Sequence, residues 1–298
     1  MNNGCSGAKF KILDNTKILK YYDTVNTSLY DQYLWLKTML EVDSKHFPKI
    51  YDWCIVGYEM ANLEHFCALS DASKNNFTNI NSLFKELTVV LDTIQKTKIS
   101  KPEKFETFLF RIIEHIKKIK HYKSIQINKE QYDIFDSDLF LAFFFEKSNI
   151  FDKEFSNCHG DLTLENIFVH DDELYLIDSN YLYNKWNSWL LDIAKLYQSL
   201  KSNYEIWFEL DFNFNYKIID NSIFVKYEYK YEIDNSNYIS IIENNIPKIK
   251  DYKKELLLFE ICNYIRMLKY KKTELDYIKA YTMLTILYNK LLKGNYND

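Results

Sequence analysis

The residues CHGDLTLENIF, numbers 158–168, and LYLIDSN, numbers 174–180, form the most informative chemical pattern in this chain. Asp161 lies in a turn that contains a glycine, the amide Asn166 follows it, and a second carboxylate, Asp178, ends a short apolar run. A positioned carboxylate can accept a hydrogen bond from an attacking hydroxyl, and amide and carboxylate oxygens are ligands that Mg²⁺ accepts. The pattern therefore predicts a site for phosphoryl transfer to a hydroxyl group.

The combination of these side chains carries more weight than any one of them. A single Asp or Asn in such a sequence is more often a turn or surface residue. Phosphoryl transfer requires little covalent help from a protein, but the nucleophile must be aligned and charge on the phosphoryl oxygens neutralised. An Asp-x4-Asn element followed closely by a strand and an Asp supplies groups for both tasks.

The composition indicates a globular protein without specialised segments. The 298 residues are 47% hydrophobic and 27% charged, and the net charge of −4 with no basic stripe argues against a nucleic-acid-binding surface. The five cysteines are scattered and include no CxxC pair, which favours a reducing compartment over a disulfide framework or zinc site. The N-terminus is polar, and no run approaches the roughly 20 apolar residues of a membrane span. A cytoplasmic protein is expected.

Residues 1–62 are predicted to form a small lobe, an antiparallel sheet with one helix. Strand patterns cover residues 9–13, 16–22, 47–53 and 54–64. Apolar residues at helical spacing cover residues 28–40, with Thr27 as the candidate N-cap. The boundary is expected at about residues 58–62.

Residues 63–298 are predicted to form a larger, mostly helical lobe, which makes the fold class α+β. Helical patterns cover residues 79–96, 102–120, 138–147, 189–200, 251–269 and 275–292. A short strand is expected at 173–177 and a hairpin at 215–231 around Asp220-Asn221.

His159-Gly160-Asp161 with Asn166, followed by Ile177-Asp178, resembles the catalytic core of the aminoglycoside phosphotransferase and choline kinase superfamily, which shares its fold with protein kinases. The resemblance covers about residues 157–205, where DIAKLYQSLKSNYE also looks like kinase-type proteins of bacterial capsule and surface-polysaccharide gene clusters. It implies a bilobal protein-kinase-like fold that uses ATP and Mg²⁺. Position by position, it implies that Asp161 is the catalytic base, that Asn166 and Asp178 bind the metal, and that His159 and Asp192 support the catalytic loop.

In the small lobe, the resemblance implies that Lys20 contacts the nucleotide phosphates. It also implies an acidic helix partner for this lysine, for which Asp31 is the candidate. Other nucleotide contacts are expected from the N-terminal glycine loop and from backbone groups of the hinge: Gly4, Ser6, Gly7, Glu59, Met60 and Ala61. Two features depart from the family pattern. The glycine loop begins almost at the N-terminus, and Asp178-Ser179-Asn180 lacks the Phe and Gly of protein kinases.

The acceptor is the least defined part of the site. Candidate acceptor-binding residues are Tyr183, Trp186, Trp189, Glu205 and Arg266, the last being one of two arginines in the chain. An aromatic and acidic surface suits a cationic amino alcohol, and aromatic platforms suit sugars equally well. The alternative is that the aromatic residues belong to the core of a chain with 25 Tyr and 21 Phe.

The sequence therefore predicts an ATP- and Mg²⁺-dependent kinase for a hydroxyl of a sugar, polyol or amino alcohol, with surface-polysaccharide precursor synthesis as its context. One alternative is an antibiotic phosphotransferase, for which the acidic residues between 205 and 211 give some support. Another is a nucleotide-binding module without turnover. The intact set of Lys20, Asp161, Asn166 and Asp178 argues against this last alternative.

Overall fold

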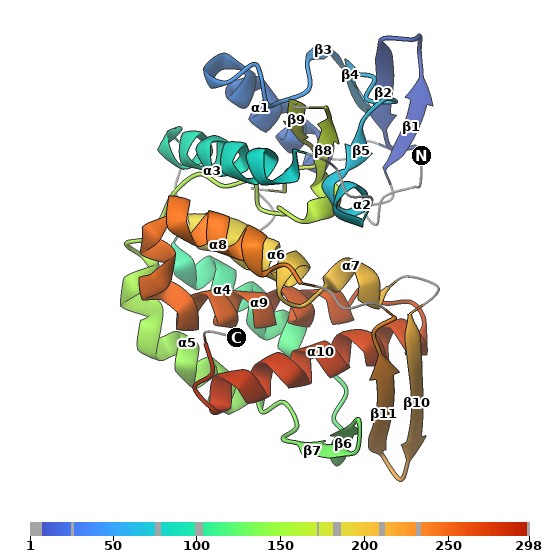
Figure 1. Ribbon diagram of the computed structural model, residues 1–298, viewed down its shortest axis with the longest axis vertical. Coiled ribbons are helices and arrows are strands. Elements are labelled where there is room, and N and C mark those ends of the chain that lie inside the picture. The colour runs from blue at the N-terminus through green and yellow to red at the C-terminus, as the bar shows by residue number, and fades with distance from the viewer. Residues whose placement is uncertain are drawn as a thin grey trace. The chain divides into compact units, whose positions relative to one another are not determined.

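The computed structural model describes residues 8–24, 27–74, 79–98, 104–171, 173–180, 186–208, 212–230 and 234–296. The chain divides into two compact units, which are described separately (Figure 1). The first unit consists of Met1–Pro102 and Ser156–Asp192, and the second of Glu103–Phe155 and Ile193–Asp298. Among the residues of functional interest, Gly4, Ser6, Gly7 and Tyr183 lie outside the described residues.

A four-stranded antiparallel sheet begins the first unit, in the strand order β1-β2-β4-β3. Its strands are β1 (Lys9–Ile12), β2 (Lys17–Tyr21), β3 (Ile50–Cys54) and β4 (Gly57–Ala61). All four expected strands are thus confirmed, with shifted or shortened ends. Gly57 pairs with Tyr21, and a Cβ atom at Gly57 would lie 2.0 Å from the carbonyl oxygen of Lys20. Only glycine therefore allows β4 to approach β2 this closely beside Lys20.

Helix α1 (Thr27–Val42) packs against β3 and β4 of this sheet (Figure 1). Its buried apolar side chains recur at helical spacing, namely Leu29, Trp35, Leu36 and Met39. Thr27, the expected N-cap, is the first residue of the helix itself. The helix gains its stability from this buried face, and it also carries residues that contact the site.

A second, three-stranded sheet of the first unit follows the CHGD segment and contains the strand before Asp178. Its order is β5-β8-β9, with all pairs antiparallel. The elements of this region are β5 (Cys67–Ala68), α2 (Leu69–Lys74), α3 (Ile80–Lys96), the 3₁₀ helix η1 (Leu164–Asn166), β8 (Ile167–His170) and β9 (Glu173–Leu176). Helix α2 packs on β8 and η1, and α3 packs on β9. The apolar face of α3 consists of Leu83, Phe84, Leu87, Val90, Leu91 and Ile94.

The second unit is mostly helical, and the division between the units falls within α6 (Trp189–Leu200). Its other helices are α4 (Phe105–Ile116), α5 (Ser137–Phe151), α7 (Tyr204–Trp207), α8 (Ser236–Asn245), η2 (Pro247–Tyr252), α9 (Lys253–Leu268) and α10 (Glu274–Leu292). Helices α9 and α10 pack along each other, and α4 packs on α9. The six expected helical segments of residues 63–298 are confirmed with shifted ends.

A four-stranded sheet of the second unit has the order β10-β11-β6-β7. Its strands are β6 (Ser124–Ile127), β7 (Glu130–Tyr132), β10 (Asn213–Ile219) and β11 (Ser222–Glu228). The expected hairpin at Asp220-Asn221 is confirmed, and both turn residues have positive φ angles of 49° and 63°. Strands β6 and β7 were not expected, because each is too short to show a periodic pattern. Among the helices described, none has the length and apolarity needed to cross a bilayer.

Candidate active site

The loop that carries Asp161 is held by Asp192, in the first turn of α6. The two oxygens of Asp192 accept hydrogen bonds from the backbone N–H groups of His159 and Gly160, each at 2.8 Å. Burial raises the pKa of Asp192 to about 7, although the two N–H donors favour the charged form and oppose this rise. Gly160 has φ 81°, a conformation that suits glycine. Together these features determine where the loop presents Asp161.

His159 links this loop to the strand that precedes Asp178. Its ring is buried, and burial lowers its pKa to about 4, so the imidazole is neutral. Its Nε2 atom lies 2.8 Å from the carbonyl oxygen of Ile177, so the single ring proton is on Nε2 and is donated there. The indole of Trp35, on α1, meets the ring edge-on at 5.4 Å. The supporting role of His159 stays a prediction.

Asn166 and Asp178 are brought to the same side of this loop by backbone pairing. The Ile177 N–H donates to the Asn166 carbonyl at 3.1 Å, and the Asn180 N–H donates to the His159 carbonyl at 2.7 Å. Asp178 lies between these two bonds, with a positive φ of 59°.

The side chain of Asn166 is oriented by Asp161. Its Nδ2 donates to the Asp161 carbonyl at 2.8 Å and lies 3.4 Å from Oδ2 of the Asp161 carboxylate. Because both partners are acceptors, the amide nitrogen must face them. The Oδ1 atom of Asn166 is thereby left for another ligand.

Lys20, on β2, reaches the same group of side chains. It is 1% exposed, its ammonium forms an ion pair with Asp178, and it donates to Oε1 of Gln32 on α1 at 2.9 Å. Burial alone would lower the pKa of Lys20, but Asp178, Tyr58 and Tyr22 together outweigh burial and raise it. The α1 residue in contact with Lys20 is therefore Gln32, not the expected Asp31.

The donor set fits a magnesium–nucleotide complex. Mg²⁺ prefers oxygen ligands and binds proteins through one or two side chains, with phosphates and waters completing its coordination. Asp178 and Asn166 offer a carboxylate and an amide oxygen from neighbouring backbone positions, and Lys20 offers a point charge for phosphate. These residues could hold Mg²⁺ and the phosphates of a nucleotide.

Three solved structures resemble this chain throughout its length. An ethanolamine kinase from Plasmodium vivax aligns with 97% of this chain and 83% of its own, at 14% identity and a TM-score of 0.55. A choline/ethanolamine kinase family protein from Mesorhizobium loti aligns with 98% of this chain and 92% of its own, at 9% identity and a TM-score of 0.55. The ADP-bound aminoglycoside phosphotransferase APH(2'')-Ib aligns with 95% of this chain and 90% of its own, at 12% identity and a TM-score of 0.53. No protein-family model and no curated protein matches the sequence.

The chain has a protein-kinase-like fold. The resemblance inferred from the CHGD and LID segments is thereby confirmed at the level of fold, and so is the α+β class. In this kinase-like fold the expected lobe boundary near residue 62 lies inside the first compact unit, and it stays a prediction.

The expected hinge residues of the kinase-like fold lie in a fully paired strand. Glu59 and Met60 are in β4, which has neighbours on both sides, and Met60 is buried. The Ala61 N–H donates to the Lys49 carbonyl at 2.8 Å, and the Asn62 N–H donates to the Thr16 carbonyl at 2.9 Å. Both N–H groups are therefore already used by backbone carbonyls, and the expected contact of this segment with a nucleotide stays a prediction.

The proposed acceptor residues have different surroundings. Trp186 and Trp189 are 1% and 2% exposed, which favours the alternative that they belong to the core. Glu205 and Arg266 are half-buried residues of the second unit, and Glu205 accepts a hydrogen bond from the Ser199 hydroxyl at 2.6 Å.

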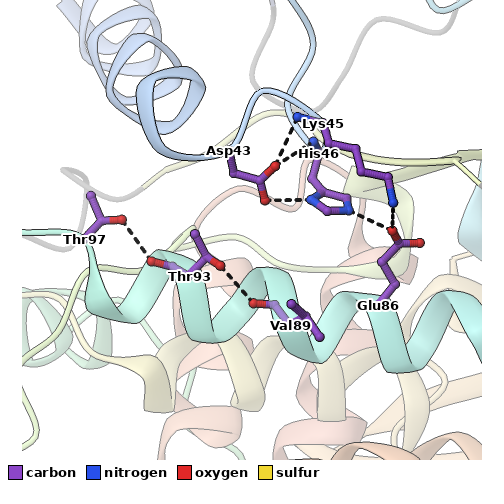
Figure 2. A network of polar contacts seen from close by, with 7 residues as sticks. All are labelled: Asp43, Lys45, His46, Glu86, Val89, Thr93 and Thr97. Atoms are coloured by element: carbon purple, nitrogen blue, oxygen red, sulfur yellow. Dashed lines mark hydrogen bonds and ion pairs between the residues drawn. The ribbon is translucent and has the colours of Figure 1, made fainter.

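A polar network that the sequence did not indicate connects the loop after α1 with α3 (Figure 2), and a backbone hydrogen bond connects the same loop with β9. His46, in the loop after α1, lies with Nδ1 2.6 Å from Asp43 and with Nε2 2.9 Å from Glu86 on α3. The Lys45 ammonium also contacts Glu86. The His46 carbonyl accepts the N–H of Leu176 at 3.0 Å, in the strand that leads to Asp178.

Burial alone would raise the pKa of Glu86, but the hydrogen bonds from His46 and Lys45 outweigh burial and lower it. Both contacts favour the ionised form of the Glu86 carboxylate. The network therefore ties the loop after α1 to α3 through charge, and to β9 through the backbone.

Proposed function

We propose that the protein transfers the γ-phosphoryl group of ATP to a hydroxyl group of a small molecule, with Mg²⁺ as the metal. The observation that supports this most is that one compact unit brings the segments of four candidate side chains together. Asn166 contacts Asp161, Lys20 pairs with Asp178, and backbone hydrogen bonds join Ile177 to Asn166 and Asn180 to His159. Such a set holds both a base and a charge-neutralising group, which phosphoryl transfer requires.

In this proposal each residue has a separate task. Asp161 accepts the hydrogen bond of the attacking hydroxyl and orients it. Asn166 and Asp178 bind Mg²⁺, and Lys20 binds phosphate oxygens. When bound, Mg²⁺ supplies positive charge that offsets the charge on the phosphoryl oxygens. His159 and Asp192 touch no reacting atom and act by positioning the loop.

The acceptor in this proposal carries a hydroxyl on a sugar, polyol or amino alcohol. Two of the similar structures are described as ethanolamine or choline/ethanolamine kinases, and the third as an aminoglycoside phosphotransferase, so their named acceptors all carry amino or ammonium groups. Glu205 is the carboxylate we propose for such a group, and Arg266 suits a polyol or anionic part of the acceptor. Surface-polysaccharide precursor synthesis is the context we propose.

The first test is a screen for ADP release with ATP, Mg²⁺ and a panel of sugars, polyols, amino alcohols and aminoglycosides. Asp161→Asn keeps the size of the side chain but removes its negative charge. We expect it to reduce transfer by at least about a hundredfold, because general acid–base groups contribute roughly that much, while nucleotide binding stays within a few-fold of wild type. Wild-type turnover in this variant would show that Asp161 is not the base.

The screen also separates the competing functions. Turnover on aminoglycosides alone would favour an antibiotic phosphotransferase. Nucleotide binding without turnover on any acceptor would favour a binding module.

A further inference from the structure

The pairing of Lys20 with Asp178 restricts how ligands can enter the site. Lys20 is 1% exposed, and in the described part of the chain its ammonium contacts Asp178, Gln32 and the side chain of Tyr58. The partner on α1 is a neutral amide, so Asp178 is the one carboxylate paired with this lysine among the described residues. Burying a charge is costly unless an opposite charge compensates it. Asp178 is therefore both the counter-charge of Lys20 and a proposed metal ligand.

We propose, building on the function proposed above, that Gln32 is a positioning residue that couples metal binding to nucleotide binding. Because Gln32 is neutral, it cannot replace Asp178 as the counter-charge of Lys20. Each ligand then binds well only when the other is present.

The two single-ligand states explain this coupling. A metal ion that binds alone must draw Asp178 away from Lys20, which leaves a buried ammonium without a counter-charge. A nucleotide that binds alone must draw Lys20 away from Asp178, which leaves that carboxylate close to the negative triphosphate. When both bind, phosphate compensates Lys20 and the metal compensates Asp178. Lys20 thus replaces Asp178 with phosphate, and Asp178 replaces Lys20 with the metal, so that no charge is left unpaired.

The charge of the residue at position 32 is therefore the variable to test. Gln32→Glu places a carboxylate beside Lys20 with almost no change in size. Separating Asp178 from Lys20 to bind a metal ion then costs less free energy. Gln32→Met, the matched control, removes the amide but adds no charge. Mn²⁺ serves as the metal probe, because the free ion is measured directly by its electron paramagnetic resonance signal, and ADP serves as the nucleotide probe by calorimetry.

In wild type, we expect saturating ADP to raise Mn²⁺ affinity at least about tenfold, within the usual range of coupling between sites. In Gln32→Glu without nucleotide, we expect Mn²⁺ to bind about tenfold more tightly than in wild type, with a smaller effect of ADP. Gln32→Met should bind Mn²⁺ no more tightly than wild type. The readout is metal binding by the nucleotide-free protein, so it does not depend on turnover.

Each outcome bears on a different statement. If wild type binds Mn²⁺ equally well with and without ADP, or if Gln32→Glu leaves the affinity for Mn²⁺ alone unchanged, the coupling role of Gln32 is wrong and the nucleotide site stands. An equal rise in Gln32→Met would show that charge at position 32 is not the cause. If ADP binds neither alone nor with Mn²⁺, the proposed function itself is overturned, and this inference with it.

Discussion

Asp192 controls the loop of Asp161 although its own side chain is 1% exposed. Each of its two oxygens accepts one backbone N–H, from His159 and from Gly160. Two adjacent N–H groups that point the same way need two acceptors, and one carboxylate supplies both. The position of the candidate base is therefore set by a residue of another element, α6, that hydrogen-bonds the backbone of the loop.

Asp192→Asn should uncouple this loop from α6. The amide offers one acceptor, and its NH₂ group would face an N–H donor, so one buried N–H loses its partner at a cost of about 1–3 kcal/mol of unfolding free energy. We expect that loss in chemical denaturation, together with a larger relative loss of transfer activity. Asp138→Asn, an exposed change in the first turn of α5, is the matched control and should leave both quantities unchanged. A fully active and fully stable Asp192→Asn protein would contradict this role.

At the scale of elements, the loop between α1 and β3 joins parts of the first unit that are distant in sequence. His46 contacts Glu86 of α3 through its side chain and Leu176 of β9 through its backbone. This network could not be predicted from the sequence, because its charged members are ordinary surface residue types and their partners are far along the chain. Gln32 was missed for a different reason. Neighbouring helical residues point about 100° apart, so the choice between Asp31 and Gln32 depends on the exact rotation of α1.

The pairing of His46 with Glu86 should be measurable as a coupling energy. In a double-mutant cycle with His46→Gln and Glu86→Gln, we expect about 1–3 kcal/mol, because the His46 side chain is 10% exposed and the Glu86 side chain 22%. Asp92 and Lys96, on the same helix, form a pair whose side chains are 58% and 74% exposed, and the same cycle there should give at most about 0.5 kcal/mol. Equal couplings for the two pairs would mean that the His46 contact adds nothing to stability.

At the scale of the whole molecule, hydrophobic periodicity and turn residues were enough to predict the small sheet, the long helices and the hairpin at Asp220-Asn221. The kinase-like fold was implied by the resemblance of the segments around Asp161, Asn166 and Asp178 to a known superfamily. The acceptor residues could not be predicted in the same way. In a chain this rich in aromatics, nothing in the sequence separates a buried tryptophan such as Trp186 from one that lines a binding surface.

Each of the two units contains a buried histidine that is neutral. Burial lowers the pKa of both His159 and His115 to about 4, and in His115 the positive charges of Lys269, Arg266, Lys118 and Arg111 add to this effect. Because these pKa values lie below that of an unfolded histidine, the unfolded chain binds more protons between about pH 6.5 and 4. This contribution to stability is complete above pH 6.5 and is lost as the pH falls towards 4.

The pH dependence of unfolding should therefore change when these histidines are replaced. For His159 the shift corresponds to at most about 3 kcal/mol between pH 6.5 and 4. We expect His159→Gln and His115→Gln each to lose less unfolding free energy over this range than wild type, as measured by denaturant titration at each pH. Burial raises the pKa values of Asp192 and Glu260 to about 7, so their contribution to the pH dependence of unfolding has the opposite sign. Both residues are present in every variant, so this contribution cancels when variants are compared. His65→Gln, an exposed change, should follow the wild-type curve.

The parallel pairing of β6 with β11 has a consequence for the order of folding. Ser124 and Ser222 are partners in this ladder, so a long section of chain must be looped before the ladder can close. The β10–β11 hairpin needs only its own two-residue turn and can form locally within microseconds. On a nascent or refolding chain, the hairpin should therefore appear early, and its docking onto β6 should be among the last events.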